Sequence, residues 1–321
     1  MSQVKSERWD AGTVPRSTPP GGLGRGLPRW RTGGRLGSIQ GYGYLAPAIV
    51  VFGLLFIYPM VVAIDLSFRS WDGFRPLSQA TWVGLKNYRT IFGHDVFLGA
   101  LGNTLVIAVV TMVVQALFSF VIAYSLWYFG QRLAGAQRAI MFFPTALAMV
   151  LVGLLWKQIL ALEGPFNAIL NLSISWFGSP DLVIWVIIWM LLWQYTGWSM
   201  MIFYAALVAV PQETIEAARL DGVGDIRMAW LIVLPLVRHA TALVLLLTLI
   251  SAAQTFDTVW VTTRGGPDHA SDTITVYAYW AAFVASGPGD FGRASAVAVV
   301  AILSLMVVAV ARIRLIRLEV E

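Results

Sequence analysis

Six polar or aromatic side chains could carry chemistry, because they lie within or beside long apolar runs where a polar group is costly. They are Asn103, Gln194, Tyr195, Trp198, Gln254 and Asp257. Amides and carboxylates form hydrogen bonds with hydroxyl groups, and aromatic faces can stack on sugar rings. These residues therefore suit the wall of a pathway for a hydroxyl-rich solute. The alternative is that they form hydrogen bonds between helices, as polar residues in membrane bundles commonly do.

Catalytic, metal and nucleotide chemistry have little support. The chain contains no cysteine, so disulfides, thiol nucleophiles and cysteine-bound metals are excluded. His94, His239 and His269 fall in three different loops without ligand spacing, so we expect no metal site. The sequence contains neither a G-x-S-x-G elbow nor a Gly-Lys pair, and the latter absence excludes a phosphate loop. We expect no catalytic residue and no cofactor bound by this chain.

A second set of polar residues lies within a segment between two apolar runs, residues 216–235 (EAARLDGVGDIRMAWLIVLP). Pro211 ends the preceding run, and Glu213 and Glu216 favour the positive start of a helix. Gly222 is suited to a left-handed stop after it. These signals predict a short helix over residues 212–221.

The composition of this short helix favours a docking element. Ala217 and Ala218 leave one side nearly bare, so that the backbone of a partner could approach closely, while Glu216 and Asp221 place charges around the contact. After Gly222, apolar residues recur with helical spacing and predict one apolar face of a second helix that ends near residue 235, with Trp230 suited to the membrane surface. They are Ile226, Ala229, Trp230 and Val233. The alternative is an ordinary connector that docks nothing.

The composition is that of an integral membrane protein. The chain is 58% hydrophobic and 12% charged, with a mean hydropathy of +0.73, whereas soluble domains are roughly 25% charged. Six apolar runs are long enough to cross a bilayer as helices. They cover residues 44–66, 98–128, 139–156, 182–210, 236–255 and 294–311. We therefore expect an all-α bundle over residues 41–311, with a connecting loop at 211–235. A shorter apolar segment at 274–286 fits an interfacial or re-entrant helix.

Positive charges predict the orientation. Residues 1–40 are rich in Gly, Pro, Ser and Arg and predict a disordered basic tail, and residues 312–321 form a second basic tail. Most Lys and Arg residues share one side when both tails and the second and fourth loops are placed there, so both termini are predicted to be cytoplasmic. The loop at 211–235 falls on the same side. The net charge of +5 follows from this topology and does not indicate nucleic-acid binding.

The spacing within residues 216–235 fits E-A-A-x3-G-x9-I-x-L-P at every specified position. It resembles the cytoplasmic coupling loop of ATP-binding-cassette (ABC) importer permeases. Outer segments are similar to those of sugar and glycerol-3-phosphate permeases, namely residues 84–88 (GLKNY), 103–104 (NT), 256–258 (FDT), 262–267 (TTRGGP) and 291–296 (FGRASA). Together the matches extend over about residues 44–311. The sequence departs from the family where His239 replaces a common proline.

This resemblance implies a six-helix permease of the type I ABC importer kind in a bacterial inner membrane, for a sugar or a related polyol or glycerophosphate compound. An external binding protein or lipoprotein would deliver the solute, and a second permease subunit would complete the pathway. Two copies of an ABC ATPase would use ATP and grip the coupling loops. The coupling residues would be Glu216, Ala217, Ala218, Asp221 and Gly222. A phosphate-bearing solute would need cationic groups such as Arg264 or Arg293.

Two other classes of membrane protein are alternatives. An intramembrane enzyme would need clustered catalytic groups, and the sequence contains no such cluster. An ion-coupled secondary transporter would have internal repeats with broken helices and several ionisable residues within its spans, whereas only Asp257 lies near such a position. The identity of the solute lies beyond the sequence.

Overall fold

The computed structural model describes residues 35–130, 134–284 and 290–318 of the chain. The chain divides into two compact units, Met1–Leu55 and Phe56–Glu321. The first unit contains α1 (Arg35–Phe52) and the start of a π-helical turn (Gly53–Ile57). Helix α1 begins within residues 1–40, which differs from the expected disordered tail, and residues 1–34 lie outside the described residues.

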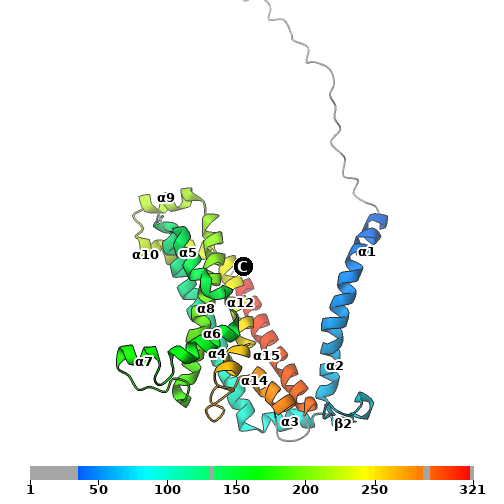
Figure 1. The fold of residues 1–321 in the computed structure, drawn as a ribbon. Helices are drawn as coiled ribbons and strands as arrows, with labels where there is room; N and C mark the ends of the chain where they lie inside the picture. Colours follow the sequence, from blue (N-terminus) through cyan, green and yellow to red (C-terminus); the bar gives the residue numbers. More distant parts are fainter. Residues whose placement is uncertain (1–34, 131–133, 285–289, 319–321) are drawn as a thin grey trace, which may run out of the picture. The chain divides into compact units, whose positions relative to one another are not determined.

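Long apolar helices form the body of the second unit (Figure 1). They are α2 (Tyr58–Ser67), α4 (Asp95–Tyr128), α8 (Pro180–Val208), α12 (Arg238–Ala253) and α15 (Phe291–Leu318). Helix α4 packs against both α8 and α12, and α2 contacts α15. Both α4 and α8 are apolar on nearly all sides, which is typical of helices surrounded by lipid and by other helices.

Shorter elements lie towards the two ends of this body (Figure 1). One end carries the antiparallel strands β1 (Arg69–Ser70) and β2 (Thr81–Trp82), which are joined through a 3-10 turn (Leu77–Gln79). The same end carries four short helices, α3 (Lys86–Phe92), α7 (Pro165–Leu170), α13 (Asp257–Thr262) and α14 (Ile274–Tyr279). A π-helical turn (Trp280–Val284) follows α14. The other end carries α9 (Gln212–Leu220), α10 (Asp225–Arg227), a π-helical turn (Met228–Val233) and α11 (Leu234–Leu236). Helix α15 runs from the end with α3 towards the end with α9.

The third apolar run, expected as a span over residues 139–156, is a broken helix, and whether it crosses the membrane stays a prediction. Helix α5 (Ala134–Phe142) leads through a 3-10 turn (Phe143–Ala146) into α6 (Met149–Ile159), and the two halves are bent by 98°. Pro144 lies in the turn, and proline interrupts the hydrogen bonds of a helix. The Gln194 side chain of α8 compensates, because its Nε2 donates to the Leu147 carbonyl at 2.9 Å.

Most of the remaining predicted spans coincide with single helices or helix pairs. Within the described residues, four helices are long and apolar enough to cross a membrane, or five if the bent pair counts as one span. The last expected run, 294–311, lies inside α15, which continues to Leu318 through most of the expected C-terminal tail. The all-helical architecture is confirmed, whereas the number of membrane crossings stays a prediction.

Candidate functional site

The segment predicted to form a docking helix, residues 212–221, forms α9 at one end of the bundle (Figure 1). The helix begins after Pro211 and ends at Leu220, with Asp221 as its C-cap. Gly222 follows with a φ of +75°, a left-handed conformation that glycine adopts without strain. The predicted helix, and its stop at Gly222, are confirmed.

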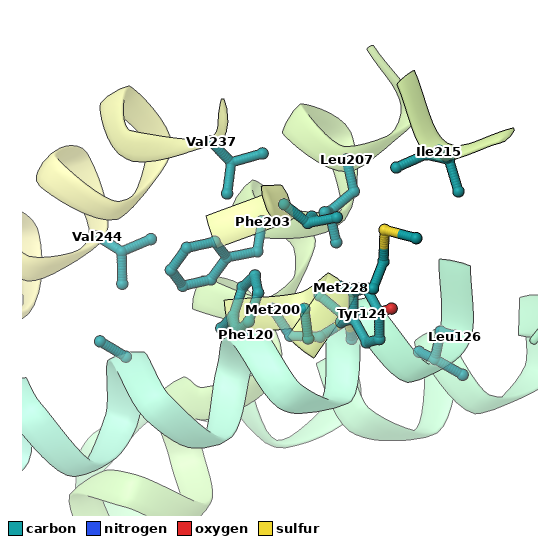
Figure 2. Packing of buried hydrophobic residues seen from close by; sticks show 14 of the residues in the cluster. Phe120, Tyr124, Leu126, Met200, Phe203, Leu207, Ile215, Met228, Val237 and Val244 are labelled. Carbon is teal, nitrogen blue, oxygen red and sulfur yellow. The ribbon is translucent and has the colours of Figure 1, made fainter. Parts of the chain in front are cut away.

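One side of α9 is buried in the protein's own core (Figure 2). Ile215 and Ala218 are only 1% and 7% exposed, and they belong to a cluster with Leu207 of α8 and Met228 of the following segment. Ala218 therefore faces inward. Only Ala217 offers the bare surface that the sequence predicted for both alanines.

The other side of α9 and the turn after it are exposed. Glu216, Ala217 and Asp221 are exposed, as a docking role requires. Leu220 and Ile226, on the two sides of the glycine turn, are 88% and 77% exposed. Exposed apolar side chains beside charged groups are typical of a surface that contacts another protein. Leu220 was missed by the sequence reasoning, although an apolar residue beside a helix stop was the available signal.

A π-helical turn explains why the predicted face of the second helix is only partly correct. Helix α10 runs directly into the turn Met228–Val233, whose wider geometry changes which side chains point inward. Met228 is completely buried and Ile226 is exposed, so the inward side does not follow the apolar face predicted from Ile226. Of the other residues on that face, Ala229 and Val233 are buried and Trp230 is exposed.

Two tyrosines at the end of α4 hold the loop in place. The Tyr128 hydroxyl donates to Asp225 Oδ1 at 2.7 Å and accepts from Arg219 Nε at 3.2 Å. The Arg219 guanidinium also lies 4.7 Å from the centre of the Tyr128 ring. The Tyr124 hydroxyl donates to the Asp225 carbonyl at 3.2 Å. Both sides of the Gly222 turn are therefore attached to α4, which the sequence did not predict.

Two of the six predicted pathway residues form hydrogen bonds within the protein. Asn103 Nδ2 donates to the carbonyls of Ala270 and Asp272, each at 3.0 Å, and so ties the loop before α14 to α4. Gln194 is 2% exposed and stabilises the break between α5 and α6. These bonds favour the alternative in which the two amides join parts of the bundle.

Tyr195 and Trp198 line a small hollow of about 20 Å³ between α4, α8 and α12. Gln115 Nε2, on its wall, donates to Ser199 Oγ at 2.6 Å. The Oε1 atom of Gln115 and the hydroxyls of Thr111 and Thr248, which also line the hollow, have no partner among the described residues. Since an unpaired buried polar group is costly, these atoms are suited to bind a hydroxyl group.

Gln254 and Asp257 lie at a break between α12 and α13, and both are exposed on this chain. The break is stabilised from the start of α14, because Thr273 Oγ1 and Thr275 Oγ1 donate to the Thr255 carbonyl at 3.0 and 2.8 Å. Asp257 lies within the candidate membrane span Arg238–Thr262. A carboxylate within a span is expected to face water or another protein, because lipid would not solvate it.

The end of the bundle opposite α9 carries a further hollow, lined by His94, His269, Asp272 and Arg293 among others. His269 Nδ1 lies 2.6 Å from Asp272 Oδ2. Burial raises the pKa of the Asp272 carboxyl, and the hydrogen bond with His269 opposes that rise. Arg293 pairs with Asp290 at 3.3 Å. His94 and His269 thus line the same hollow, yet the described residues contain no group of three side chains suited to a metal ion.

Comparison with known proteins identifies relatives over most of the chain. Residues 103–318 match the family described as binding-protein-dependent transport system inner membrane component. The sulfoquinovosyl glycerol transport system permease protein SmoG of Agrobacterium fabrum is 30% identical over 91% of this chain and 95% of its own length. The multiple sugar-binding transport system permease protein MsmF of Streptococcus mutans is 27% identical over 87% of this chain and 96% of its own length.

The fold is also similar to that of a solved structure. A chain in the crystal structure of a bacterial ABC transporter involved in the import of the acidic polysaccharide alginate superposes with a TM-score of 0.75. The similarity extends over 88% of this chain and 96% of the other, with 20% sequence identity. At this level of identity, the similarity concerns the arrangement of helices.

Proposed function

Since the chain belongs to the family of binding-protein-dependent transport system inner membrane components, and is thus a permease of an ABC importer, we propose that it transports a sugar or a related polyol or glycerophosphate compound. Support comes from the names of the two relatives, which both concern sugars or sugar derivatives. The hollow beside Tyr195 and Trp198 adds chemical support, because it combines aromatic faces with unpaired hydroxyl and amide groups.

The exposed side of α9 is the proposed seat of an ATPase subunit. The observation that carries this proposal is the pair of exposed apolar side chains, Leu220 and Ile226, on a loop attached to the bundle through Ile215 and Tyr128. A helix that is exposed on one side and packed against the bundle on the other can transmit a displacement of a bound partner to the bundle. ATP would be bound and hydrolysed by that partner, present in two copies per importer.

In this proposal the α9 end of the bundle faces the cytoplasm, where ATP is available. The distribution of Lys and Arg supports the same orientation, with both termini on the cytoplasmic side. The end with α3 and the β1–β2 hairpin would then face outward and receive the external binding protein.

A second permease subunit is proposed to cover Gln254 and Asp257. Both are exposed on this chain at the break between α12 and α13, and a partner helix bundle would enclose them in an aqueous pathway shared by the two subunits. Closure of the ATPases would move α9, and with it α4 and α8, so that the pathway opens to each side in turn.

Co-purification in mild detergent tests the ATPase seat. We expect the wild-type chain to retain an ATPase subunit and an L220S/I226S double variant to lose most of it, because both apolar contacts are removed. Ile169→Ser on α7 is the matched control, since Ile169 is 78% exposed but lies away from α9. Equal retention by the double variant and the wild type would show that the seat lies elsewhere. A transport-competent chain that purifies without any ATPase would favour a secondary transporter.

Uptake of radiolabelled solutes tests the substrate class. The assembled importer is placed in vesicles with its external binding protein outside. The vesicles should accumulate a sugar or polyol only when ATP is enclosed in the lumen, in contact with the ATPase subunits. Accumulation of amino acids or metal ions in place of sugars would refute the proposed substrate class without affecting the assignment of the family.

A further inference from the structure

A groove at the start of α12 has features that the proposed transport function does not use. It is lined by Leu231, Pro235, Leu236, Arg238 and His239, with Thr214 of α9 at one side, and its empty volume is about 830 Å³ including the space open to the surroundings. The groove therefore lies between the coupling loop and the first turn of a candidate membrane span, Arg238–Thr262.

One wall of the groove is apolar and exposed. Leu231 is 71% exposed and Leu236 is 49% exposed. Trp230, next to them, is 38% exposed and contacts Phe120 with 5.4 Å between ring centres. Tryptophan at the end of a span is typical of the boundary between hydrocarbon and headgroups. The wall thus suits the upper part of an acyl chain.

The other wall is basic. The side chains of Arg238 and His239 are exposed, and neither has a hydrogen-bond or ion-pair partner in the part of the chain that the structure describes. Arg238 is the first residue of α12 and of the candidate span Arg238–Thr262, and the end of a span is where lipid headgroups are expected. An arginine there attracts anionic lipid and can form two parallel hydrogen bonds with a phosphate.

We propose that this groove binds one anionic phospholipid of the surrounding leaflet, with its phosphate on Arg238 and His239 and an acyl chain along Leu231 and Leu236. A soluble phosphate compound would not use the apolar wall. A protein partner would need to reach the level at which α12 enters the membrane. Bound lipid at this position would join the coupling loop to the start of α12 and so fill the groove between them.

Native mass spectrometry of the assembled importer, released from nanodiscs that contain phosphatidylethanolamine and phosphatidylglycerol, tests this proposal. We expect the wild type to retain one phosphatidylglycerol per copy of this chain. Loss of the positive charge in an R238Q/H239Q variant should weaken retention about fivefold or more, which corresponds to about 1 kcal/mol. Arg227→Gln is the matched control, because Arg227 is an exposed basic residue of α10 that does not line the groove.

An Arg238→Lys variant keeps the positive charge at this position and should retain the lipid, which separates a charge effect from damage to the fold. Unchanged retention in R238Q/H239Q, or the same loss in Arg227→Gln, would overturn the proposal. Release of the ATPase subunit from R238Q/H239Q with no change in lipid would assign the groove to the protein partner and would also overturn it. The measurement counts lipid on the chain, so its result does not depend on which solute is transported.

Discussion

Replacing Ile215 with alanine is expected to release α9 from the bundle while the bundle itself stays folded. Ile215 is 1% exposed and belongs to the cluster that joins α4, α8 and the segment after α9. Truncation of a buried isoleucine to alanine costs about 2–5 kcal/mol. At about 3 kcal/mol, the ratio of docked to released α9 falls roughly 150-fold. Ile215→Val, which removes one methylene, costs about 0.5–1.5 kcal/mol and should lower that ratio at most about tenfold.

The absence of cysteine from the chain makes this measurable with a single spin label. Ala217→Cys places a label on the exposed side of α9. Electron paramagnetic resonance of the full-length chain in detergent should show a growing mobile component from the parent to Ile215→Val to Ile215→Ala. In the assembled importer, solute-stimulated ATP hydrolysis should fall in the same order.

Leu220→Ala serves as the control for this series. Leu220 is on the same helix but is 88% exposed, so its truncation should leave the label immobile while weakening the proposed contact with the ATPase. If Ile215→Ala left both the spectrum and the stimulated hydrolysis unchanged, α9 would not depend on the cluster for its position. The proposed transmission of force through Ile215 would then be wrong.

Three further predictions concern other contacts. Gly197→Ala should lower the melting temperature of the detergent-solubilised chain, because a Cβ at Gly197 would meet the Met141 carbonyl oxygen, whereas Gly99→Ala, with open space around it, should not. Asp257→Asn should change solute-stimulated ATP hydrolysis without lowering the melting temperature, because the carboxylate is exposed and does not pack in the core. Unchanged stimulation would count against the proposed place of Asp257 in the pathway. Tyr128→Phe removes the hydroxyl that joins Arg219 and Asp225, about 1 kcal/mol per bond, and should partly mobilise a label at Ala217→Cys.

The sequence predicts α9 well because its signals are local. A proline before the helix and a glycine after it act on the backbone within a few residues, and they do so in any tertiary context. The inward direction of Ala218 is different. It depends on which face of α9 meets Leu207 and Met228, and nothing within residues 212–221 specifies that contact.

Hydropathy gives the positions of the apolar runs but not their direction in space. The break between α5 and α6 depends on Pro144 together with a hydrogen bond from Gln194, about fifty positions further along the chain. The same limit applies to Asn103 and Gln194 as candidate pathway residues. A buried amide is costly whether a solute or a neighbouring carbonyl pairs with it, so its presence in an apolar run does not distinguish the two roles.

The arrangement of the buried clusters indicates how a movement of α9 could reach the pathway. One cluster holds α9 against the ends of α4, α8 and α12, and a second lies further along the same three helices, with Val259 of α13 and Val276 of α14. Helices shared by two packed clusters move as one body, because close-packed side chains resist small displacements. The exposed residues Gln254 and Asp257 lie at the α12–α13 break beside the second cluster. A push on Leu220 and Ile226 would therefore change the position of these two side chains without any change inside the helices that connect them.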